Sequence, residues 1–567
     1  MRSNIVAALM AGGSVLAATP ALAERGAGGH LNILYWQAPS ILNPYMSASS
    51  KDTDPTALIL DPLANFDAEG RLVPTLAVEI PTVENGGVSA DLTSITWKLR
   101  PGVLWSDGTP LTSADVLFTA EYCLDAATGC AAADKFANIA SVEALDDLTI
   151  KITFTKPRPN PYTAFVSAYT PVLQAAQFAA CKGAAAVSCT AQNFGPIGTG
   201  PYIIEEFRPN DVGTYKVNPT YRDAAKPAFA TVTLKGGGDA MGAARAVLQT
   251  GEFDYAWNVQ IAPNVMDSFV AEGKGVAITA FGPTVESLRF QLTDPSPDLG
   301  DKRATLEGGP HPILSDIRVR KALALVIDRD LINEVGYGAA GQPSCNVLAA
   351  PPIYASMAND SCLKIDIEGA QALLDEAGWV PGADGIREKD GQRLTLVFQT
   401  STNAVRQDTQ AMIKQAWTDL GVDTQLRNIE AGVYFGNDPA SPDTYRKFFA
   451  DVEMYSSGNT GGDPENHMKG WTCDDIPAPA TGFAGNNVSR FCRADYDALW
   501  AELSATANLD DRARIAKSLN DMIIQDYAAV PLVHRGLVSV KSVALENLEA
   551  NDWDSALSAI EDWTRKP

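Results

Sequence analysis

Three groups of aromatic residues with amide or carboxylate neighbours are the part of this sequence best suited to recognising a small molecule. Their members are Tyr35 and Trp36, then Tyr255, Trp257 and Asn258, and, in a glycine-rich stretch, Tyr455, Asn459, Asp463 and Trp471. Flat rings offer apolar stacking surfaces, while amides and carboxylates orient a ligand through hydrogen bonds. The pattern favours a site for a solute with both apolar faces and polar groups. Trp36 and Trp257 fit equally well as core residues at strand ends.

Motifs for catalysis and for metal binding are absent from the sequence. The chain has no H-E-x-x-H, G-x-S-x-G, Walker or C-x-x-C motif. Its four histidines are far apart, at His30, His311, His467 and His534. We therefore expect no catalytic residue, no metal site and no cofactor. A pair of carboxylates that hydrolyses peptides or glycosides remains open, because the sequence does not give the distance between two acidic side chains.

The first 23 residues have the features of a secretory signal peptide. Arg2 supplies a positive charge, residues 5–16 are apolar, and residues 21–23 form a small-x-small cleavage site ending at Ala23. The apolar run is shorter than the roughly 20 residues that a membrane span needs. Because Glu24, and not a cysteine, follows the cleavage site, no lipid anchor is expected. The sequence predicts a periplasmic protein that is not itself embedded in the membrane.

Charge and cysteine content further limit which partners and which cellular environment are expected. The chain carries 68 acidic against 44 basic residues, a formal charge of -24, and such a field repels nucleic acid. Eight cysteines in an exported chain predict disulfides. Proximity in the sequence favours local pairs, although other connectivities stay possible. These pairs are Cys123 with Cys130, Cys181 with Cys189, Cys345 with Cys362, and Cys473 with Cys492.

Strand and helix patterns alternate along the chain, which indicates an α/β protein. Residues 394–399 and 422–429 have strand character, and the helical segment 405–420 lies between them. Strand, helix and strand of this length predict a βαβ unit with parallel strands and a right-handed crossover. Residues 148–154 alternate with a period of two, as a half-buried strand does.

Two further helices have recognisable ends. The helix expected over 114–124 begins after Thr112 or Ser113, either of which suits an N-cap. A second helix over 512–527 is followed by a strand expected over 529–540.

A chain of this length is too long for a single hydrophobic core, so several lobes are expected. A cleft between two open α/β sheets is a natural place for a solute.

Ordered blocks of sequence resemble one known family. The blocks are residues 60–77, 97–116, 198–202 with 218–221, 318–328 and 372–379. In this order they resemble the extracytoplasmic solute-binding proteins of ABC importers, family 5, which includes oligopeptide-, dipeptide-, nickel- and opine-binding members. Binding without chemistry agrees with the missing catalytic motifs.

The resemblance implies a two-lobed periplasmic-binding-protein fold with a hinge and an extra domain inserted in the N-terminal lobe. After the signal peptide at 1–23, lobe I would comprise 24–70, 200–280 and 520–567. The inserted domain would comprise 71–199, and lobe II would comprise 281–519. The implied partners are a small-molecule ligand and an inner-membrane ABC permease, with the protein itself a monomer and with no nucleic acid involved.

Family position also implies the ligand contacts. They would be Tyr35, Trp36, Trp257, Asn258, Glu286, Arg289, Tyr455, Asn459 and Asp463. The aromatic residues would stack on the ligand, and Arg289 would hold a carboxylate or hydroxyl. Glu286 would take an amine or hydroxyl.

The ligand class follows from the loop that contains Asn459. In peptide-binding relatives an aspartate near an aromatic residue anchors the α-amino group of the ligand. In this chain Asn459 occupies the corresponding region, and its amide cannot make the charge-assisted bond that an ammonium group prefers. This favours opine-like, sugar-bearing or modified amino-acid ligands, while peptides return if Asp463 reaches the cleft. His467 keeps a metal chelate open as a ligand. The competing hypotheses for the whole chain are an exported hydrolase of peptides or glycosides and a holdase-like chaperone.

Overall fold

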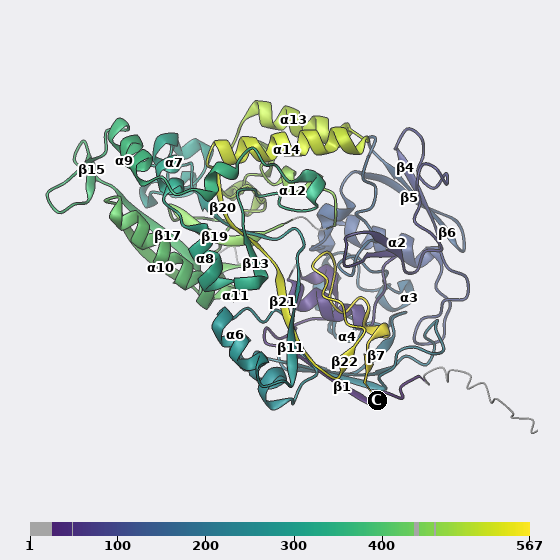
Figure 1. The fold of residues 1–567 in the computed structure, drawn as a ribbon. Helices are drawn as coiled ribbons and strands as arrows, with labels where there is room; N and C mark the ends of the chain where they lie inside the picture. The colour runs from purple at the N-terminus through teal and green to yellow at the C-terminus, as the bar shows by residue number, and fades with distance from the viewer. Residues whose placement is uncertain (1–24, 48, 436–440, 459–460, 567) are drawn as a thin grey trace, which may run out of the picture.

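Two mixed β-sheets organise the chain, and each forms the centre of one lobe (Figure 1). The computed structural model describes residues 25–566 except 48, 436–440 and 459–460, so the expected signal peptide and Asn459 lie outside the described residues. We call the part built on the seven-stranded sheet the first lobe. Its strands, in spatial order, are β11 (Gly275–Ala280), β21 (Leu537–Ser542), β10 (Tyr255–Ala256), β1 (His30–Tyr35), β9 (Thr231–Gly236), β8 (Val212–Val217) and β7 (Tyr202–Arg208).

The second lobe is built on a six-stranded sheet with helices packed against it. The strands, in spatial order, are β13 (Gly341–Pro343), β20 (Ala529–Arg535), β12 (Val285–Phe290), β19 (Val452–Ser457), β17 (Thr395–Ser401) and β18 (Asp423–Ile429). Helix α10 (Ala404–Asp419) connects β17 to β18, and these two strands pair in parallel. This confirms the expected βαβ unit. Trp417 of α10 is fully buried, and its indole N–H donates to Leu323 O at 2.9 Å.

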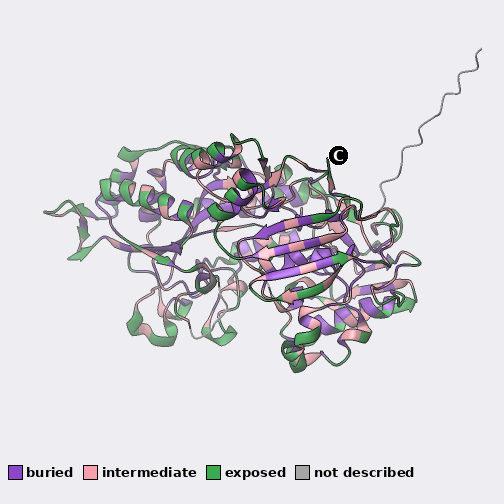
Figure 2. Cartoon of the chain, turned by 90° about the horizontal axis from the view of Figure 1, so that it is seen from below, coloured by how far each residue is buried: buried purple, intermediate pink, exposed green. Residues whose placement is uncertain are grey.

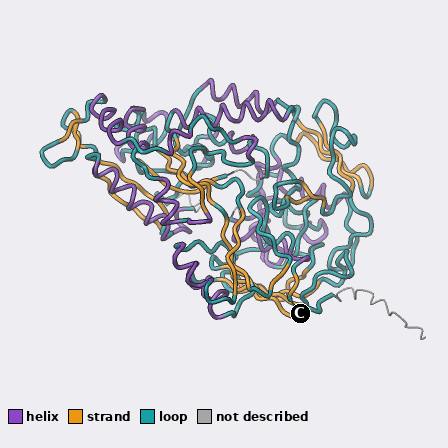
Figure 3. The backbone as a smooth tube through the Cα atoms, viewed as in Figure 1, coloured by secondary structure: helices purple, strands orange, loops and turns teal. Residues whose placement is uncertain are grey.

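Other helices surround these sheets and are shown in purple in Figure 3. In the second lobe they are α7 (Ile317–Leu325), α8 (Arg329–Gly336), α9 (Ile367–Glu376), α12 (Glu465–Lys469), α13 (Ala494–Ala505) and α14 (Leu509–Gln525). In the first lobe, α5 (Ala240–Arg245) and α6 (Pro263–Val270) follow strands β9 and β10. The view from below in Figure 2 shows strands of a sheet in which buried and intermediate positions are mixed, and β9 alternates strictly between the two.

A smaller three-stranded sheet lies within the segment expected as an inserted domain. Its strands are β4 (Ser94–Lys98), β6 (Thr149–Phe154) and β5 (Ile139–Asp146), and helix α2 (Ser113–Leu124) packs on it. Helix α2 begins at the expected place because Thr112 and Asp115 form a capping box. The helix and the strand at 149–154 are thus confirmed.

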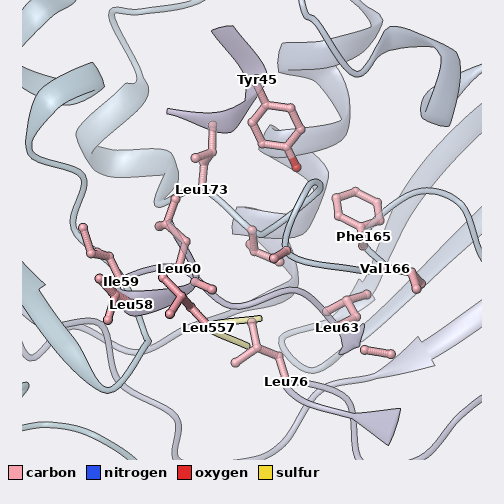
Figure 4. Close-up of a cluster of buried hydrophobic side chains, with 14 of the residues drawn as sticks. Tyr45, Leu58, Ile59, Leu60, Leu63, Leu76, Phe165, Val166, Leu173 and Leu557 are labelled. Carbon is pink, nitrogen blue, oxygen red and sulfur yellow. The ribbon is translucent and has the colours of Figure 1, made fainter. Parts of the chain in front are cut away.

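One apolar core joins this segment to the first lobe. Figure 4 shows part of it, where Leu58 and Leu63 lie with Phe165 and with Leu557 from the C-terminal segment. Residues that are far apart in the sequence therefore share one core. Replacing one of these buried leucines with alanine typically costs about 2–5 kcal/mol.

Two segments cross from one sheet to the other. Strand β11 of the first sheet leads into β12 of the second through residues 281–284, and β20 of the second leads into β21 of the first through Gly536. The sequence predicted a single strand over 529–540, which was wrong. Gly536 separates two strands because the chain changes sheet there, from pairing with β12 to pairing with β10 and β11. A side chain does not fit at this point, since a Cβ would lie 2.4 Å from Thr279 Cγ2 and 3.2 Å from two carbonyl oxygens. The chain after residue 520 therefore contributes to both sheets, whereas the sequence placed all of it in lobe I.

Four disulfides hold local loops, and they are the pairs that proximity favoured. They join Cys123 to Cys130, Cys181 to Cys189, Cys345 to Cys362, and Cys473 to Cys492. Each connects residues of the same lobe or segment, so none restricts movement of one sheet relative to the other. In the part of the chain that the structure describes, no helix is both long and apolar enough to cross a membrane.

Candidate ligand-binding site

Three adjoining cavities lie between the two lobes, and Lys135 lines all of them. The acidic cavity, about 350 Å³, is lined by Thr53, Tyr169, Asp552 and Trp553 of the first lobe and by Thr284 and Gly458. The arginine cavity, about 290 Å³, is lined by Asp134 on one side and by Arg289, Tyr455, His467 and Trp471 on the other. The loop cavity, about 300 Å³, is lined by Phe66, Tyr162, Gly461, Gly462 and Asp463. Together they form a cleft of the size that small ligands occupy.

Arg289 is the strongest binding group in the arginine cavity. It lies on β12 and is only 2% exposed, and its Nη2 donates to Ser457 Oγ at 2.8 Å. The guanidinium lies 4.5 Å from the ring centre of Trp471 and 5.3 Å from that of Tyr455. Its Nη1 is buried and has no hydrogen-bond partner among the described residues. Since a buried donor without a partner costs about 1–3 kcal/mol, an oxygen atom of a ligand would be bound strongly there.

The carboxyl group beside Arg289 does not neutralise it at neutral pH. Glu453 of β19 pairs with Arg289 in the antiparallel register and is fully buried. Burial raises the pKa of Glu453 to about 8, although hydrogen bonding by Gln399 and the charge of Arg490 act in the opposite direction. The Glu453 carboxyl is therefore mostly protonated at pH 7, and Arg289 keeps a net positive charge for an anionic ligand.

His467 contributes a neutral imidazole to the same cavity. Its Nε2 lies 3.2 Å from Val347 O. Burial, and then the positive charge of Arg289, lower the pKa of His467 to about 4. Among the residues that the structure describes, no three His, Cys, Asp or Glu side chains are grouped so that they could hold a metal ion.

Four of the sequence-predicted contacts form a packed cluster in the first lobe. Tyr35 and Trp257 stack with ring centres 4.8 Å apart and planes 2° from parallel, and both are buried. Trp36 donates from Nε1 to Asn258 O at 2.9 Å, and Asn258 Oδ1 accepts from Arg535 Nη2 at 3.1 Å. None of these four residues lines the three cavities. Their contact with a ligand stays a prediction.

Glu286 lies away from the cavities as well. It is 1% exposed and makes a bidentate pair with Arg406 of α10, with Nε–Oε1 at 2.8 Å and Nη2–Oε2 at 3.1 Å. Arg535 Nη1 lies 3.9 Å from Glu286 Oε2. Because Arg535 also bonds Asn258, this group of side chains links the two lobes beside the crossover at Gly536.

A comparison with known protein families identifies the family of this two-lobed chain. Residues 71–477 match the bacterial extracellular solute-binding proteins, family 5, in their middle part. The chain belongs to this family.

Relatives of this family 5 protein span most of its length. The glutathione-binding protein GsiB of Escherichia coli (strain K12) is 24% identical over 88% of this chain and 88% of its own. Protein XP55 of Streptomyces lividans is 28% identical, and the match covers 65% of this chain and 61% of XP55. The fold matches the oligopeptide-binding protein AppA from Bacillus subtilis, which was solved with a nonapeptide, at a TM-score of 0.77 and 19% identity, covering 96% of this chain and 100% of AppA. The α/β fold with two lobes is thereby confirmed.

Asp463 of this family 5 protein is held by an arginine. Its Oδ1 and Oδ2 accept from Arg512 Nη2 at 2.6 and 2.7 Å, and Glu465 lies beside the same guanidinium. The carboxylate lines the loop cavity, but its charge is already compensated. Release from Arg512 would be needed before it could anchor an ammonium group.

Sequence reasoning did not select several residues that line the cleft. They are Asp134, Lys135, Tyr169, Asp552 and Trp553. The sequence pattern could have indicated the last two, because Asp552 and Asp554 flank Trp553. An aromatic residue beside carboxylates is the same pattern that pointed to the predicted contacts. Asp134 and Lys135 lie in an alanine-rich stretch without such a signal, and only the fold brings them to the second lobe.

Proposed function

We propose that this family 5 protein is the periplasmic substrate-binding component of an ABC importer and captures a small polar solute between its lobes. The single observation that carries the proposal is the inter-lobe cleft in which Arg289 presents a buried, unpaired Nη1. The residues at 281–284 and Gly536 would act as the hinge. Closure would remove water from the ligand and strengthen each polar contact, and it would be favoured by the higher affinity of the closed form.

The ligand is expected to carry an anionic or strongly polar group that reaches Arg289. Opine-like molecules, sugar-bearing or modified amino acids and short peptides all satisfy this condition. Tyr455 and Trp471 would contact the apolar part of the solute, and the cluster of Tyr35, Trp36, Trp257 and Asn258 would support the first-lobe side of the cleft. Glu286 and Asp463 are expected to act mainly through their arginine partners.

The remaining parts of the proposal concern location and partners. Cleavage of the signal peptide near Ala23 would release the protein into the periplasm as a monomer, and the closed form would dock on an inner-membrane permease. Lobe I would comprise 24–70, 200–280 and the chain from Gly536, and lobe II would comprise 281–535, with 71–199 as the inserted domain. We propose a binding role without catalysis.

A thermal-shift experiment tests the function. Protein stripped of retained solute is screened against amino-acid conjugates, opines, sugars and peptides, and a bound ligand should raise the melting temperature, because only the native state binds it. Arg289→Met should remove the shift for anionic compounds, while Arg514→Met, at an exposed arginine on α14, should keep it. A compound that is turned over, with loss of turnover on mutation of one acidic residue, would identify an exported hydrolase instead.

A further inference from the structure

The acidic cavity contains a carboxylate that the solute-binding proposal does not yet use. Asp552 lies at the start of the C-terminal segment and faces Thr284 and Gly458 of the second lobe across the cavity. Its Oδ2 is buried and has no hydrogen-bond partner among the described residues. Gly282 in the crossover allows this position, because a Cβ there would lie 2.7 Å from Oδ2.

The nearby cations are occupied by other groups. Lys135 Nζ lies 3.3 Å from Asp134 Oδ2. Arg535 donates to Asn258 Oδ1 at 3.1 Å and to Ser456 Oγ at 3.4 Å, and its closest carboxylate contact is Glu286 at 3.9 Å. Within 4.0 Å, no described lysine, arginine or histidine pairs with Asp552.

Two further buried carboxyl groups, Asp54 and Asp554, are the chain neighbours of Thr53 and Trp553, which line the same cavity. Asp54 lies below Tyr169, whose hydroxyl donates to Asp54 Oδ1 at 3.3 Å, and Asp554 follows Trp553. Burial raises the pKa of Asp552 to about 7, although the charge of Arg535 and polar contacts with Thr284 and Gly282 act in the opposite direction. Burial also raises the pKa of Asp554 to about 6, and burial together with Asp554 raises the pKa of Asp54. In these three carboxyl groups the nearby donors and charges do not offset the cost of burying the ionised form.

We propose that the acidic cavity is a subsite for a cationic group, an ammonium or a guanidinium, and that Asp552 is its direct partner. The aromatic rings of Tyr169 and Trp553 border the same space and suit a cation as well. This subsite lies in the first lobe, whereas Arg289 lies in the second, and Asp134, Lys135 and Gly458 line both cavities.

The two charged ends define the ligand class. The solute is a zwitterion whose anionic group binds Arg289 and whose cationic group binds Asp552, so that each end bonds a different lobe. Such a ligand favours the closed form, because only closure brings both charges to it at once. This inference rests on the proposed function and narrows the solute to one class.

Binding of the cation also has a proton signature. A cation favours the ionised form of Asp552, so binding near neutral pH releases protons and strengthens as the pH rises from 6 to 8. The charged and titratable groups near Asp552 are Asp134 and Lys135, which line the same cavity, and Arg535 and Asp54, which interact with it electrostatically. Burial lowers the pKa of His534, whose Nε2 lies 2.7 Å from Gly282 O.

The test compares five probes by thermal shift and calorimetry on the full mature chain. Trialanine and octopine carry both charges, N-acetyl-trialanine lacks the cation, trialanine amide lacks the anion, and sucrose carries neither. We expect the zwitterions to stabilise the wild type, and Asp552→Asn to weaken them about ten- to a hundredfold, the loss of one charge-assisted bond. N-acetyl-trialanine should bind the wild type and Asp552→Asn equally.

One control and one further variant keep the result interpretable. Asp147→Asn removes an exposed carboxylate outside the cleft and should change nothing, while Asp134→Asn, at a side chain 60% exposed, should weaken the zwitterions because it leaves Lys135 uncompensated. Equal affinity of the wild type and Asp552→Asn for trialanine and octopine would overturn the inference. Stabilisation by N-acetyl-trialanine or sucrose alone would overturn it and leave the proposed function intact. If none of the five probes binds, the inference fails for the class it names, and a solute retained from the cell decides the proposed function separately.

Discussion

Replacing Glu286 with glutamine separates the role that the sequence implied from the role that the contacts indicate. Family position implies that Glu286 binds the ligand, whereas the structure pairs it with Arg406 through two bonds of 2.8 and 3.1 Å. Glutamine has nearly the same shape but no charge, and it places an NH2 group against one guanidinium nitrogen. The variant should therefore keep the fold and lose stability.

The size of the loss follows from the burial of both partners. Glu286 is 1% and Arg406 is 7% exposed, so solvent cannot replace the lost charge. Breaking a buried ion pair from one side costs about 3–5 kcal/mol. Glutamine keeps one acceptor, and Ser401 Oγ and Ser456 Oγ still accept from Arg406, so we expect a decrease of about 3 kcal/mol in the free energy of unfolding.

Urea unfolding of the ligand-free protein measures this decrease. The double variant Glu286→Gln with Arg406→Met should lose less than the sum of the two single variants, because the two residues act as a pair. The affinity for solute should change by less than the stability does. An unchanged midpoint, combined with a more than tenfold weaker ligand affinity, would refute the structural reasoning and restore Glu286 as a ligand contact.

Three further predictions concern the cleft. Arg289→Met should weaken the affinity for an anionic solute by tenfold or more in calorimetry, while Arg289→Lys should retain part of the affinity. Equal affinities of the wild type and Arg289→Met would contradict the role of the free Nη1 of Arg289. Because the pKa of Asp552 is raised to about 7 and an unfolded aspartate titrates near 4, the native state binds more protons between these values, so this group lowers stability as pH rises from about 4 to 7. Asp552→Asn should reduce the change of melting temperature with pH over this range. The same pH dependence in the variant and the wild type would argue against the raised pKa of Asp552. Gly461→Ala should reduce affinity by hindering closure, since its φ is +74° and a Cβ would lie 2.5 Å from the Phe66 ring; unaltered affinity would show that this contact does not limit closure.

Periodicity and local chemistry were sufficient to predict several elements. The βαβ unit around α10, the capped helix α2 and the four local disulfides all depend on residues close in sequence, which is why they could be predicted. The strand expected over 529–540 was wrong because the chain changes from β12 of one sheet to β10 and β11 of the other at Gly536, and each pairing is a contact between residues far apart in the sequence. No local pattern contains that contact.

The binding residues were less predictable for the same reason. Family position supplied Arg289 and Tyr455, which line the cleft, and their contact with a ligand stays a prediction. Asp463 and Glu286 have arginine partners on α14 and α10 that only the tertiary structure supplies. Lys135 and Asp552 reach the cleft because the C-terminal segment and the inserted region pack into one core, which the order of residues along the chain does not reveal.

The central claim is that the cleft holds one solute and leaves it chemically unchanged. Native mass spectrometry of freshly purified protein, followed by mass analysis of the released molecule, tests this most directly. We predict one small zwitterionic molecule per chain in the wild type, released intact, and its loss in Arg289→Met. A wild type that retains no solute under any growth condition, or one that releases a cleaved product, would contradict the account.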